Sequence, residues 1–387
     1  MTGMPRHVYV HVPFCSRRCS YCDFAIAVRR DVPWRDYADA LTAELAVRFG
    51  APGSAPVDTL YLGGGTPSKL GPEGVARALE AVTRWAVPVG GAEVTLEANP
   101  EDVTLGAARA WRAAGVSRVS LGVQSFDPAV LAWMHRTHQA DDVPRAVEAL
   151  HAAGLDDVSL DLIFAVPDAV PNAVPNAVPD AVPRDWSRDV ASALALGPTH
   201  VSCYGLTVEP ATPLGRWHAR GEVAGTPDDR YAREFLATDA ALTSAGFEPY
   251  EVSNYATPGR RARHNAAYWR GVPYLGLGPS AHGFDGAVRR WNLGAWAQWR
   301  TALTAHPPRD PVEGSETLDA GARAAEAVYL GLRTRDGLAL EPADVPVVAP
   351  WIAAGWAKVD GDRLRLTPEG WLRMDALAAA LTARRSP

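Results

Sequence analysis

Between residues 7 and 246 the chain alternates two patterns of apolar and polar positions. Short apolar runs rich in Val, Leu, Ile and Tyr predict β-strands, and they lie at 7–14, 58–64, 93–99, 118–125, 157–166 and 200–208. Longer runs with an apolar residue every three or four positions predict helices, and they lie at 33–50, 72–86, 105–115, 141–154, 184–197 and 228–246. Strands that alternate with helices predict a parallel sheet with right-handed crossovers.

Polar residues and glycines gather in or just after the predicted strands. They are Cys15, Gly63–Thr66, Glu97, Gln124, Asp161 and Tyr204. In a barrel of alternating strands and helices, the carboxyl ends of the strands converge on one mouth. We therefore expect an α/β fold, a partial (βα)6 barrel over residues 1–255, in preference to an open doubly wound sheet.

The end of the chain shows a different pattern of predicted elements. Residues 311–387 contain two helical runs, with a β-hairpin predicted between them around Asp360–Gly361–Asp362. This order is typical of a small winged-helix-like domain. The segment has no basic excess, so DNA binding is not expected of it.

Residues 165–184 repeat one tetrapeptide five times, as AVPD, AVPN, AVPN, AVPD and AVPR. Proline at every fourth position prevents a helix and removes donors that a strand would need. We expect an extended surface loop that arose by tandem expansion. A functional role for the loop is the alternative.

Composition and charge narrow the possible functions. The chain has 387 residues, of which 47% are hydrophobic, and its formal net charge is −6. A nucleic-acid-binding protein usually shows a basic excess, and this chain shows none. No run approaches the roughly 18 apolar residues of a membrane-spanning helix. The first residues also lack a separate apolar segment with a cleavage site, so we expect a cytoplasmic protein.

The chain has four cysteines, and three of them, Cys15, Cys19 and Cys22, fall within one short stretch after the first predicted strand. A disulfide framework spreads its cysteines along the chain, whereas this grouping indicates a metal site. Thiolates are the ligands of iron–sulfur clusters, and Arg17 and Arg18 nearby are expected to favour the thiolate form.

The spacing C-x3-C-x2-C also bears on the kind of metal. Structural zinc takes four protein ligands, whereas three thiolates on a four-iron cluster leave one iron open for a small molecule. We expect a 4Fe–4S cluster; a zinc site or free thiols are the alternatives. Cys203, on the sixth predicted strand, is expected to be a buried core residue, with cluster ligation as the alternative.

The segment YVHVPFCSRRCSYCDF resembles the cluster motif of radical S-adenosylmethionine (SAM) proteins. More narrowly, the chain resembles the branch that holds the oxygen-independent coproporphyrinogen III oxidases and the HemW-type heme chaperones. The resemblance covers nearly the whole chain and rests also on GGGTPS (63–68), EANP (97–100), SLGVQSF (120–126), DLIF (161–164), YGLTVEPATPL (204–214), HNAAYW (264–269) and GLGPSAHG (276–283). Deleting residues 169–180 would restore the spacing of the family after the fifth strand.

The resemblance implies a site for SAM beside the cluster. In the family, the amine and carboxylate of SAM chelate the open iron, and one electron cleaves the sulfonium to give a deoxyadenosyl radical. By resemblance the Gly63–Thr66 turn, with Gly64, Gly65 and Thr66, holds the methionyl end, and Glu97 pairs with ribose hydroxyls or the amine. The other positions implied to contact SAM are Tyr9, Tyr21, Gln124, Arg136, Asp161 and Gly205. A tight turn, or a satisfied residue at the barrel mouth, is the alternative for each.

Three features favour the chaperones over the oxidases. The oxidases commonly carry a further cysteine where this chain has Phe24, and a longer arm than the fourteen residues before Cys15. HNAAYW matches an HNxxYW signature of the HemW-like branch, within the segment 256–310. Histidine is a common axial ligand of heme iron, and aromatic rings offer flat apolar surface to a porphyrin.

These observations lead to a functional expectation. His264 is the expected heme ligand, with Asn265, Tyr268 and Trp269 shaping the site; a packed His–Trp pair is the alternative, and His282 is a second candidate. We expect a heme chaperone that binds heme and a SAM-ligated 4Fe–4S cluster and delivers heme to an apo-haemoprotein such as a respiratory enzyme. Membrane contact is expected only through that acceptor, and the sequence does not indicate the electron donor. The alternatives are coproporphyrinogen III oxidation and another radical reaction on a tetrapyrrole.

Overall fold

The computed structural model describes residues 3–167 and 185–385. Most of the AVPx repeat falls outside these residues, so the expectation of an extended loop there is not addressed by the structure. No helix in the described ranges is both long and apolar enough to cross a membrane.

The centre of the molecule is a nine-stranded sheet in the order β11-β1-β4-β5-β6-β7-β8-β10-β9. The strands from β11 to β8 are parallel neighbours, and β10 and β9 continue the sheet in antiparallel sense. The predicted partial barrel is confirmed, with its six strands at β1 (His7–Val12), β4 (Ala55–Gly64), β5 (Ala86–Ala98), β6 (Arg118–Gln124), β7 (Asp157–Phe164) and β8 (His200–Gly205). The added edge strands are β11 (Leu275–Leu277), β10 (Asn254–Ala256) and β9 (Glu248–Glu251).

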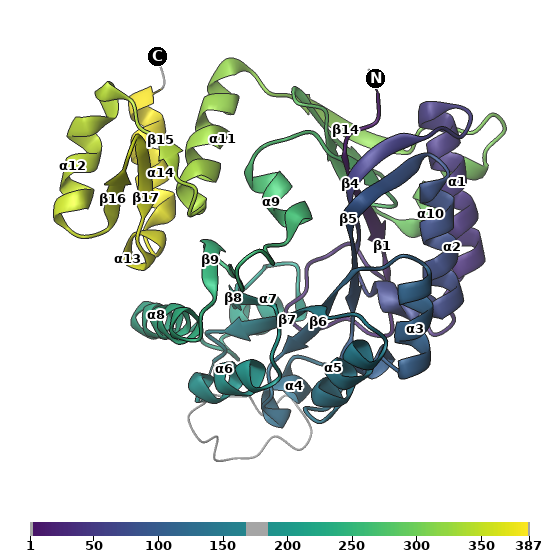
Figure 1. Ribbon diagram of the computed structural model, residues 1–387, viewed down its shortest axis with the longest axis horizontal. Helices are drawn as coiled ribbons and strands as arrows, with labels where there is room; N and C mark the ends of the chain where they lie inside the picture. The colour runs from purple at the N-terminus through teal and green to yellow at the C-terminus, as the bar shows by residue number, and fades with distance from the viewer. Residues whose placement is uncertain (1–2, 168–184, 386–387) are drawn as a thin grey trace.

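Helices cover the outer side of this curved sheet (Figure 1). The six predicted helices form close to the expected bounds, as α1 (Trp34–Phe49), α2 (Gly71–Thr83), α3 (Leu105–Ala113), α5 (Asp142–Ala152), α6 (Trp186–Ala195) and α8 (Asp228–Ser244). Shorter elements that the periodicity did not predict are η1 (Pro67–Leu70), η2 (Pro100–Asp102), α4 (Pro128–Trp133) and α7 (Pro213–Ala219).

Side chains alternate between the two faces of each strand, and this alternation separates the core from the lumen. On β4, Leu60 and Leu62 are buried in the main hydrophobic cluster, whereas Tyr61 between them lines a cavity inside the barrel. On β1, Val8 and Val10 face the core and Tyr9 faces the cavity. The lumen is therefore polar and aromatic while the helices pack against an apolar face.

The cysteine segment forms a loop between β2 (Phe14–Cys15) and β3 (Ala27–Val28), which pair with each other. Beyond the barrel, α9 (Arg263–Trp269) leads through β11 to an antiparallel sheet of β12 (His282–Phe284), β13 (Val288–Asn292) and β14 (Val312–Thr317), with α10 (Trp296–Thr304) beside α1. Strand β14 lies inside the predicted 311–387 segment but pairs with β13 of the preceding one.

The last part of the chain forms a small lobe that stands apart from the helices α1 and α2 (Figure 1). It consists of α11 (Ala320–Arg333), β15 (Leu338–Ala339), η3 (Pro342–Asp344), α12 (Val345–Ala353), β16 (Ala357–Asp360), β17 (Arg363–Leu366), α13 (Pro368–Trp371) and α14 (Met374–Arg385). The predicted hairpin is present, because β16 and β17 pair around Gly361, whose φ of 61° suits glycine.

Candidate functional site

A cavity of about 670 Å³ opens at the mouth of the barrel. It brings together all the cysteines of the predicted cluster motif and all the positions implied to contact SAM: Cys15, Cys19, Cys22, Tyr9, Tyr21, Gly64, Gly65, Thr66, Glu97, Gln124, Arg136, Asp161 and Gly205. These residues come from β1, β2, β4, β5, β6, β7 and β8 and from the loops that follow them. Cys203 packs in the hydrophobic core, as expected, because it alternates on β8 with Ser202 and Tyr204 of the cavity wall.

Backbone hydrogen bonds fix the cysteine loop against the barrel. The Ser20 amide donates to the carbonyl of Met134 (3.2 Å), and the Ser20 carbonyl accepts from the amide of Leu214 (2.8 Å). The amide of Arg29 donates to the carbonyl of Cys15 (2.9 Å). The loop is thus tied to the C-terminal end of α4 and to the first turn of α7.

Burial raises the pKa of two of the thiols, against the effect expected of the nearby arginines. Burial raises the pKa of Cys22 to about 11. Burial also raises the pKa of Cys15, although a contact of its sulfur with Thr66 Oγ1 (3.4 Å) acts in the opposite direction. Arg18 donates to the backbone carbonyl of Cys22 (3.3 Å) and Arg17 is exposed. Arg18 favours the thiolate of Cys15, as expected, but desolvation outweighs this effect at Cys15.

Three half-buried thiols on one cavity wall are a donor set suited to an iron–sulfur cluster, since each thiolate binds a different iron of the cube. Within the described ranges, no three histidine, cysteine or carboxylate side chains meet closely enough to hold a single metal ion. The residues present therefore fit the cluster that the motif predicts.

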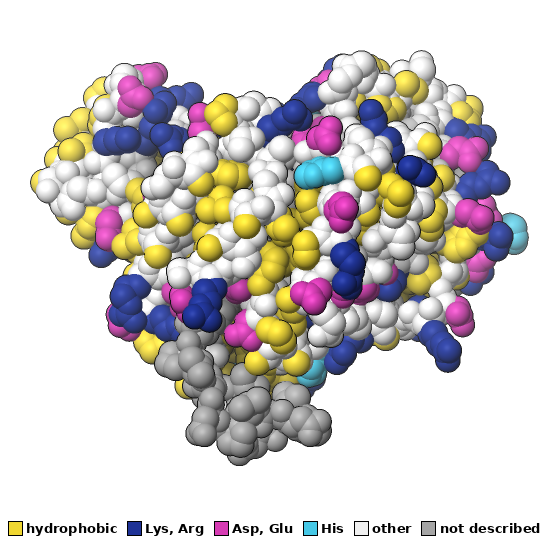
Figure 2. All heavy atoms as spheres, turned by 60° about the horizontal axis from the view of Figure 1, so that its bottom comes forward, with side chains coloured by type: hydrophobic (Ala, Val, Ile, Leu, Met, Phe, Trp, Pro, Cys, Tyr) yellow, Lys and Arg dark blue, Asp and Glu magenta, His cyan; other side chains and the backbone are white. Residues whose placement is uncertain are grey.

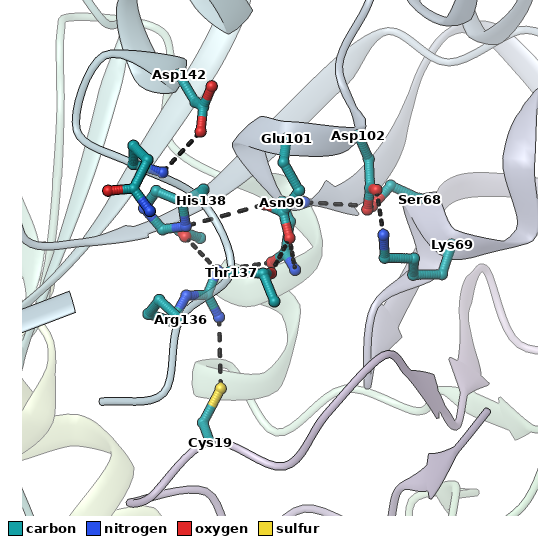
Figure 3. Close-up of polar contacts among 12 residues, drawn as sticks. Cys19, Ser68, Lys69, Asn99, Glu101, Asp102, Arg136, Thr137, His138 and Asp142 are labelled. Carbon is teal, nitrogen blue, oxygen red and sulfur yellow. Dashed lines mark hydrogen bonds and ion pairs between the residues drawn. The ribbon is translucent and has the colours of Figure 1, made fainter. Parts of the chain in front are cut away.

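Arg136 anchors the cavity wall on the side of Cys19 (Figure 3). Its Nη2 donates to Asn99 Oδ1 (2.7 Å) and to the carbonyl of Gly122 (2.6 Å), and its Nη1 lies 3.7 Å from Cys19 Sγ. The Nε atom is buried without a protein partner in the described structure. The guanidinium is thus held by two neutral acceptors beside a predicted cluster ligand, where it can face an anion.

The contacts around Arg136 continue behind the cavity wall. Thr137 donates to Glu101, and Lys69 donates to Asp102 (2.6 Å), as Figure 3 shows. His138 is buried, and its Nδ1 lies 3.9 Å from a carboxylate oxygen of Glu101. Sequence reasoning singled out the EANP segment and Arg136 but not Thr137 and His138, because these two meet Glu101 only in the fold.

Glu97 projects from the end of β5 into the cavity. One carboxylate oxygen accepts from the hydroxyl of Tyr61 (2.7 Å) and the other from the amide of Gly64 (2.9 Å). Burial raises the pKa of Glu97 to about 7 in spite of these bonds. The side chain is therefore poised to lose a proton when a cation arrives beside it.

The glycine turn after β4 is shaped by close packing against the cysteine segment. Gly64 has a φ of 111°, and a Cβ there would lie 2.5 Å from the ring of His11. A Cβ on Gly65 would lie 2.8 Å from the backbone carbonyl carbon of Pro13. Only glycine fits at these positions, and the turn can therefore pass directly beneath the first cysteine.

The remaining predicted positions also have structural signatures of a site. Gln124 ends β6 at a register shift and has a φ of 66°, a left-handed conformation that costs about 1 kcal/mol or more for a non-glycine residue. Asp161 accepts from Ser120 (3.0 Å) and Ser159 (3.2 Å). The hydroxyl of Tyr9 bonds Nδ1 of His11 (3.1 Å).

Sequence reasoning missed the residues deeper in the lumen. Arg118, Ser120, His200 and Ser202 line the same cavity. The signal was available, because they lie an even number of positions from Gln124 on β6 or from Tyr204 on β8, and such residues share one face of a strand.

The HNxxYW segment forms α9, which closes one side of the lumen. His264 is 1% exposed, and its Nδ1 bonds Thr59 Oγ1 (2.6 Å) while its Nε2 bonds the Tyr268 hydroxyl (2.9 Å). Its ring stacks on Tyr61 at 5.1 Å between centroids. Asn265 donates to the Tyr250 hydroxyl (3.3 Å). Both ring nitrogens of the expected heme ligand are therefore already occupied in this state.

A second cavity, of about 890 Å³, adjoins the first. It is lined by Asn265, Tyr268 and Trp269 of the HNxxYW segment and by His282. Its aromatic walls are completed by Phe24, Tyr274, Phe284 and Trp291. Seven residues line both cavities and form the wall between them: Tyr9, Asp23, Phe24, Gly64, Glu97, Asn265 and Tyr268. We refer to the two as the cysteine cavity and the aromatic cavity.

On the face that Figure 2 shows, basic and acidic side chains are intermingled and neither sign dominates. This distribution agrees with the small net charge of −6. No basic stripe of the kind typical of nucleic-acid-binding proteins is seen on that face.

Comparison with known families finds two matches along the chain. The family model of the radical SAM superfamily matches residues 9–176, which include the cysteine motif and the strands up to β7. The model of the HemN C-terminal domain matches residues 318–373, which include α11 and the β16–β17 hairpin.

Curated relatives are similar over most of the chain. A heme chaperone HemW from Mycobacterium tuberculosis (strain ATCC 25618 / H37Rv) is 40% identical over 390 residues, which cover 98% of this chain and 96% of the relative. The heme chaperone HemW from Escherichia coli (strain K12) is 36% identical over 309 residues, 78% of this chain and 75% of the relative.

Among solved structures, the Escherichia coli coproporphyrinogen III oxidase (HemN), a radical SAM enzyme, matches with a TM-score of 0.79. The match covers 98% of this chain and 90% of the other, at 21% identity. At that identity the likeness establishes the fold, including the partial barrel and the C-terminal lobe, and leaves the activity to other evidence.

Proposed function

Because this chain belongs to the HemW family of radical SAM heme chaperones, we propose that it binds heme and delivers it to an acceptor haemoprotein. The acceptor is an apo-haemoprotein, with a respiratory enzyme as one candidate. Membership of the radical SAM superfamily implies a 4Fe–4S cluster and SAM as cofactors.

The cysteine cavity would hold both cofactors. Cys15, Cys19 and Cys22 would bind the cluster, because they are the thiols on its wall. Arg136, with its unpartnered Nε, would face the SAM carboxylate, and Glu97 would accept from the amine or the ribose hydroxyls. The cluster and SAM supply one-electron chemistry when they are bound.

The rest of the predicted SAM positions would complete this pocket. Tyr9 would lie beside the methionyl chain and Tyr21 beside the adenine, while the backbone of Gly205 would offer polar contacts. Gly64, Gly65 and Thr66 would hold the methionyl end, and Gln124 and Asp161 would line the far wall. The packing of Tyr21 against the apolar cluster around Met134 and Leu214 supports a flat apolar surface there.

The observation that carries the chaperone proposal is the aromatic cavity beside the cysteine cavity. Its volume of about 890 Å³ and its aromatic walls are those of a site for a large flat ligand. Tyr268 and Trp269 of the HNxxYW segment line it, so the motif that distinguishes the branch contributes directly to its walls. We assign heme to this cavity.

Heme transfer is the test of the function. The cluster is reconstituted in the anaerobic chain, heme is titrated to a stoichiometric complex, and the complex is mixed with an excess of an apo-haemoprotein. The chaperone proposal predicts a Soret band that changes on binding and changes again as the acceptor fills. Transfer should be faster than from free heme at equal concentration.

The oxidase alternative is tested on the same preparation. Coproporphyrinogen III is incubated with SAM and a low-potential reductant, and the porphyrin products are separated. The proposal predicts no conversion above that of a Cys19→Ser variant. Sustained formation of protoporphyrinogen, together with no heme transfer, would replace the chaperone by the oxidase.

A further inference from the structure

A heme iron in the aromatic cavity needs a protein ligand with a free lone pair. His264 does not offer one, because its side chain is 1% exposed and both of its ring nitrogens are hydrogen-bonded. It lines the cysteine cavity and not the aromatic one. To bind iron there it would have to break both bonds and leave its stack on Tyr61.

The other histidines that line the two cavities are committed as well, with one exception. His11 bonds the Tyr9 hydroxyl through Nδ1 and the Ala25 carbonyl through Nε2 (2.9 Å). His200 bonds Ser159 (2.7 Å) and the Tyr250 hydroxyl (2.8 Å). His135 interacts with the backbone of Arg18.

The exception is His282, whose ring has no hydrogen-bond partner among the described residues although it lies on the cavity wall. His282 begins β12 and is exposed, and it pairs across the sheet with Trp291 of β13. Its ring stacks on the indole at 5.9 Å between centroids, with 26° between the planes.

Strand β14 lies on the other side of β13 from His282 and packs against Trp291. Trp291 pairs with Gly314 of β14, and a Cβ at Gly314 would lie 2.4 Å from the indole. The absence of a side chain at Gly314 therefore lets the indole lie flat across the sheet. The imidazole lies against this indole, and neither of its nitrogens has a hydrogen-bond partner among the described residues.

The surroundings of His282 suit a porphyrin face. Tyr274, Phe284 and Trp269 provide apolar wall, and Phe24, 57% exposed, projects at the boundary with the cysteine cavity. Arg289, the nearest cation, is engaged by Glu316 (3.1 Å) and Glu326. These carboxylates would repel propionates, so the propionates of a bound heme would point away from them and toward solvent.

Together these contacts lead to one inference, which rests on the function proposed above. We propose that the axial ligand of the heme iron is His282, with the porphyrin seated in the aromatic cavity against Trp291 and Phe24. His264 then acts as a structural residue that joins α9 to β4 through Thr59. Because Tyr9, Glu97 and Tyr268 line both cavities, the edge of the heme borders the predicted SAM site.

The test compares three histidine variants of the full chain with its cluster reconstituted. His282→Ala removes the proposed ligand, and His264→Gln changes the buried histidine while keeping hydrogen-bonding capacity. His151→Ala is the matched control, because His151 is exposed on α5 and lines neither cavity. Each variant is titrated with ferric heme, and the complex is examined by absorption, magnetic circular dichroism and electron paramagnetic resonance.

The expected result has two parts. His282→Ala should lose the histidine-ligated spectrum and bind heme at least about tenfold more weakly. About tenfold is the smallest loss of metal affinity that is typical when a residue supporting a metal ligand is replaced. Added imidazole should restore the spectrum. His264→Gln and His151→Ala should retain the ligand signature of the wild type. Iron and sulfide content shows that each variant still carries its cluster.

The outcomes separate this inference from the function on which it rests. If the wild type binds no heme, the chaperone function fails. If the wild type binds heme and His282→Ala keeps both its spectrum and its affinity, the ligand assignment is overturned while the function stands. Loss of the ligand signature in His264→Gln, with restoration by imidazole, would move the assignment to His264.

Discussion

The difference in unfolding free energy between the Glu97→Gln variant and the wild type, both without the cluster, should shift in favour of the variant as the pH rises. The Glu97 carboxylate accepts from the Tyr61 hydroxyl and the Gly64 amide, and burial raises its pKa from 4.5 to about 7. Between these two values the native chain holds a proton that the unfolded chain has lost. Stability therefore falls as pH rises through this window and levels off above about pH 7.

The size of the effect follows from the pKa difference. A shift from 4.5 to about 7 corresponds to about 3 kcal/mol, at about 1.4 kcal/mol per unit. The range from pH 5 to pH 8 contains only part of this titration, so we expect about 2 kcal/mol. The Gln side chain can keep both contacts, because its Oε1 accepts from the Gly64 amide and its Nε2 donates to the Tyr61 hydroxyl oxygen. Any remaining change in hydrogen bonding does not depend on pH and cancels in the comparison.

Urea unfolding of both proteins at pH 5 and pH 8 measures the prediction. The difference in unfolding free energy between Glu97→Gln and wild type should change by about 2 kcal/mol in favour of the variant. That corresponds to about 1 M in the urea midpoint for an m-value of about 2 kcal/mol/M. Glu313→Gln, at an exposed glutamate of β14, should show the same difference at both pH values. A Glu97→Gln difference that stays constant with pH would refute the reasoning.

The same proton gives a second measurement on the reconstituted protein. If the SAM amine lies beside Glu97, its positive charge lowers the carboxyl pKa, and SAM binding at pH 6 releases up to about one proton. Calorimetric titrations in two buffers of different ionisation enthalpy count that proton. Glu97→Gln should release none of it, and an equal release from both proteins would place the amine elsewhere.

Three further substitutions test other parts of the structure. Arg136→Ala removes the guanidinium donor from two part-buried oxygens, Asn99 Oδ1 and the Gly122 carbonyl, and should cost about 1–3 kcal/mol in urea unfolding, with less iron retained after reconstitution. Glu44→Ala takes one ion-pair partner from Arg48, which keeps Asp310, and removes the buried acceptor of the Gly278 amide and of Asn292 Nδ2 and Trp299 Nε1. It should cost about 3–5 kcal/mol in urea unfolding, and a loss under about 1 kcal/mol would contradict this. Gly314→Val pushes against the Trp291 indole and should weaken heme binding while leaving the iron content unchanged, whereas Gly294→Ala, in open space, should change neither.

The sequence pattern predicted the barrel because each strand and helix carries its own periodicity. Its largest error in bounds was β5, expected at 93–99 and found at Ala86–Ala98. Pro88 and the Gly90–Gly91 pair are typical of a turn, but Pro56–Val57 of β4 pairs with this segment and keeps it extended. Tertiary pairing overrides local propensity there, and no pattern within the segment indicates the partner.

The sequence also predicted only part of the candidate site. The strand ends placed the cysteines and the SAM positions correctly on one cavity, because parallel strands share a direction. For the heme ligand, the sequence favoured His264 over His282 because HNAAYW matches a signature of the branch, but it gave no sign of which ring is already hydrogen-bonded in the fold. What separates them is that Thr59 and Tyr268 occupy the ring of His264, whereas Trp291 leaves the nitrogens of His282 free.

The shared wall has a consequence for how the two cavities work together. Tyr9 lines both, and its hydroxyl bonds His11, whose other nitrogen bonds the Ala25 carbonyl beside Phe24. A ligand in either cavity that moves Tyr9 therefore changes the cysteine loop and the surface offered to the other ligand. Any such coupling is reciprocal in free energy, so SAM changes the affinity for heme by the factor with which heme changes the affinity for SAM.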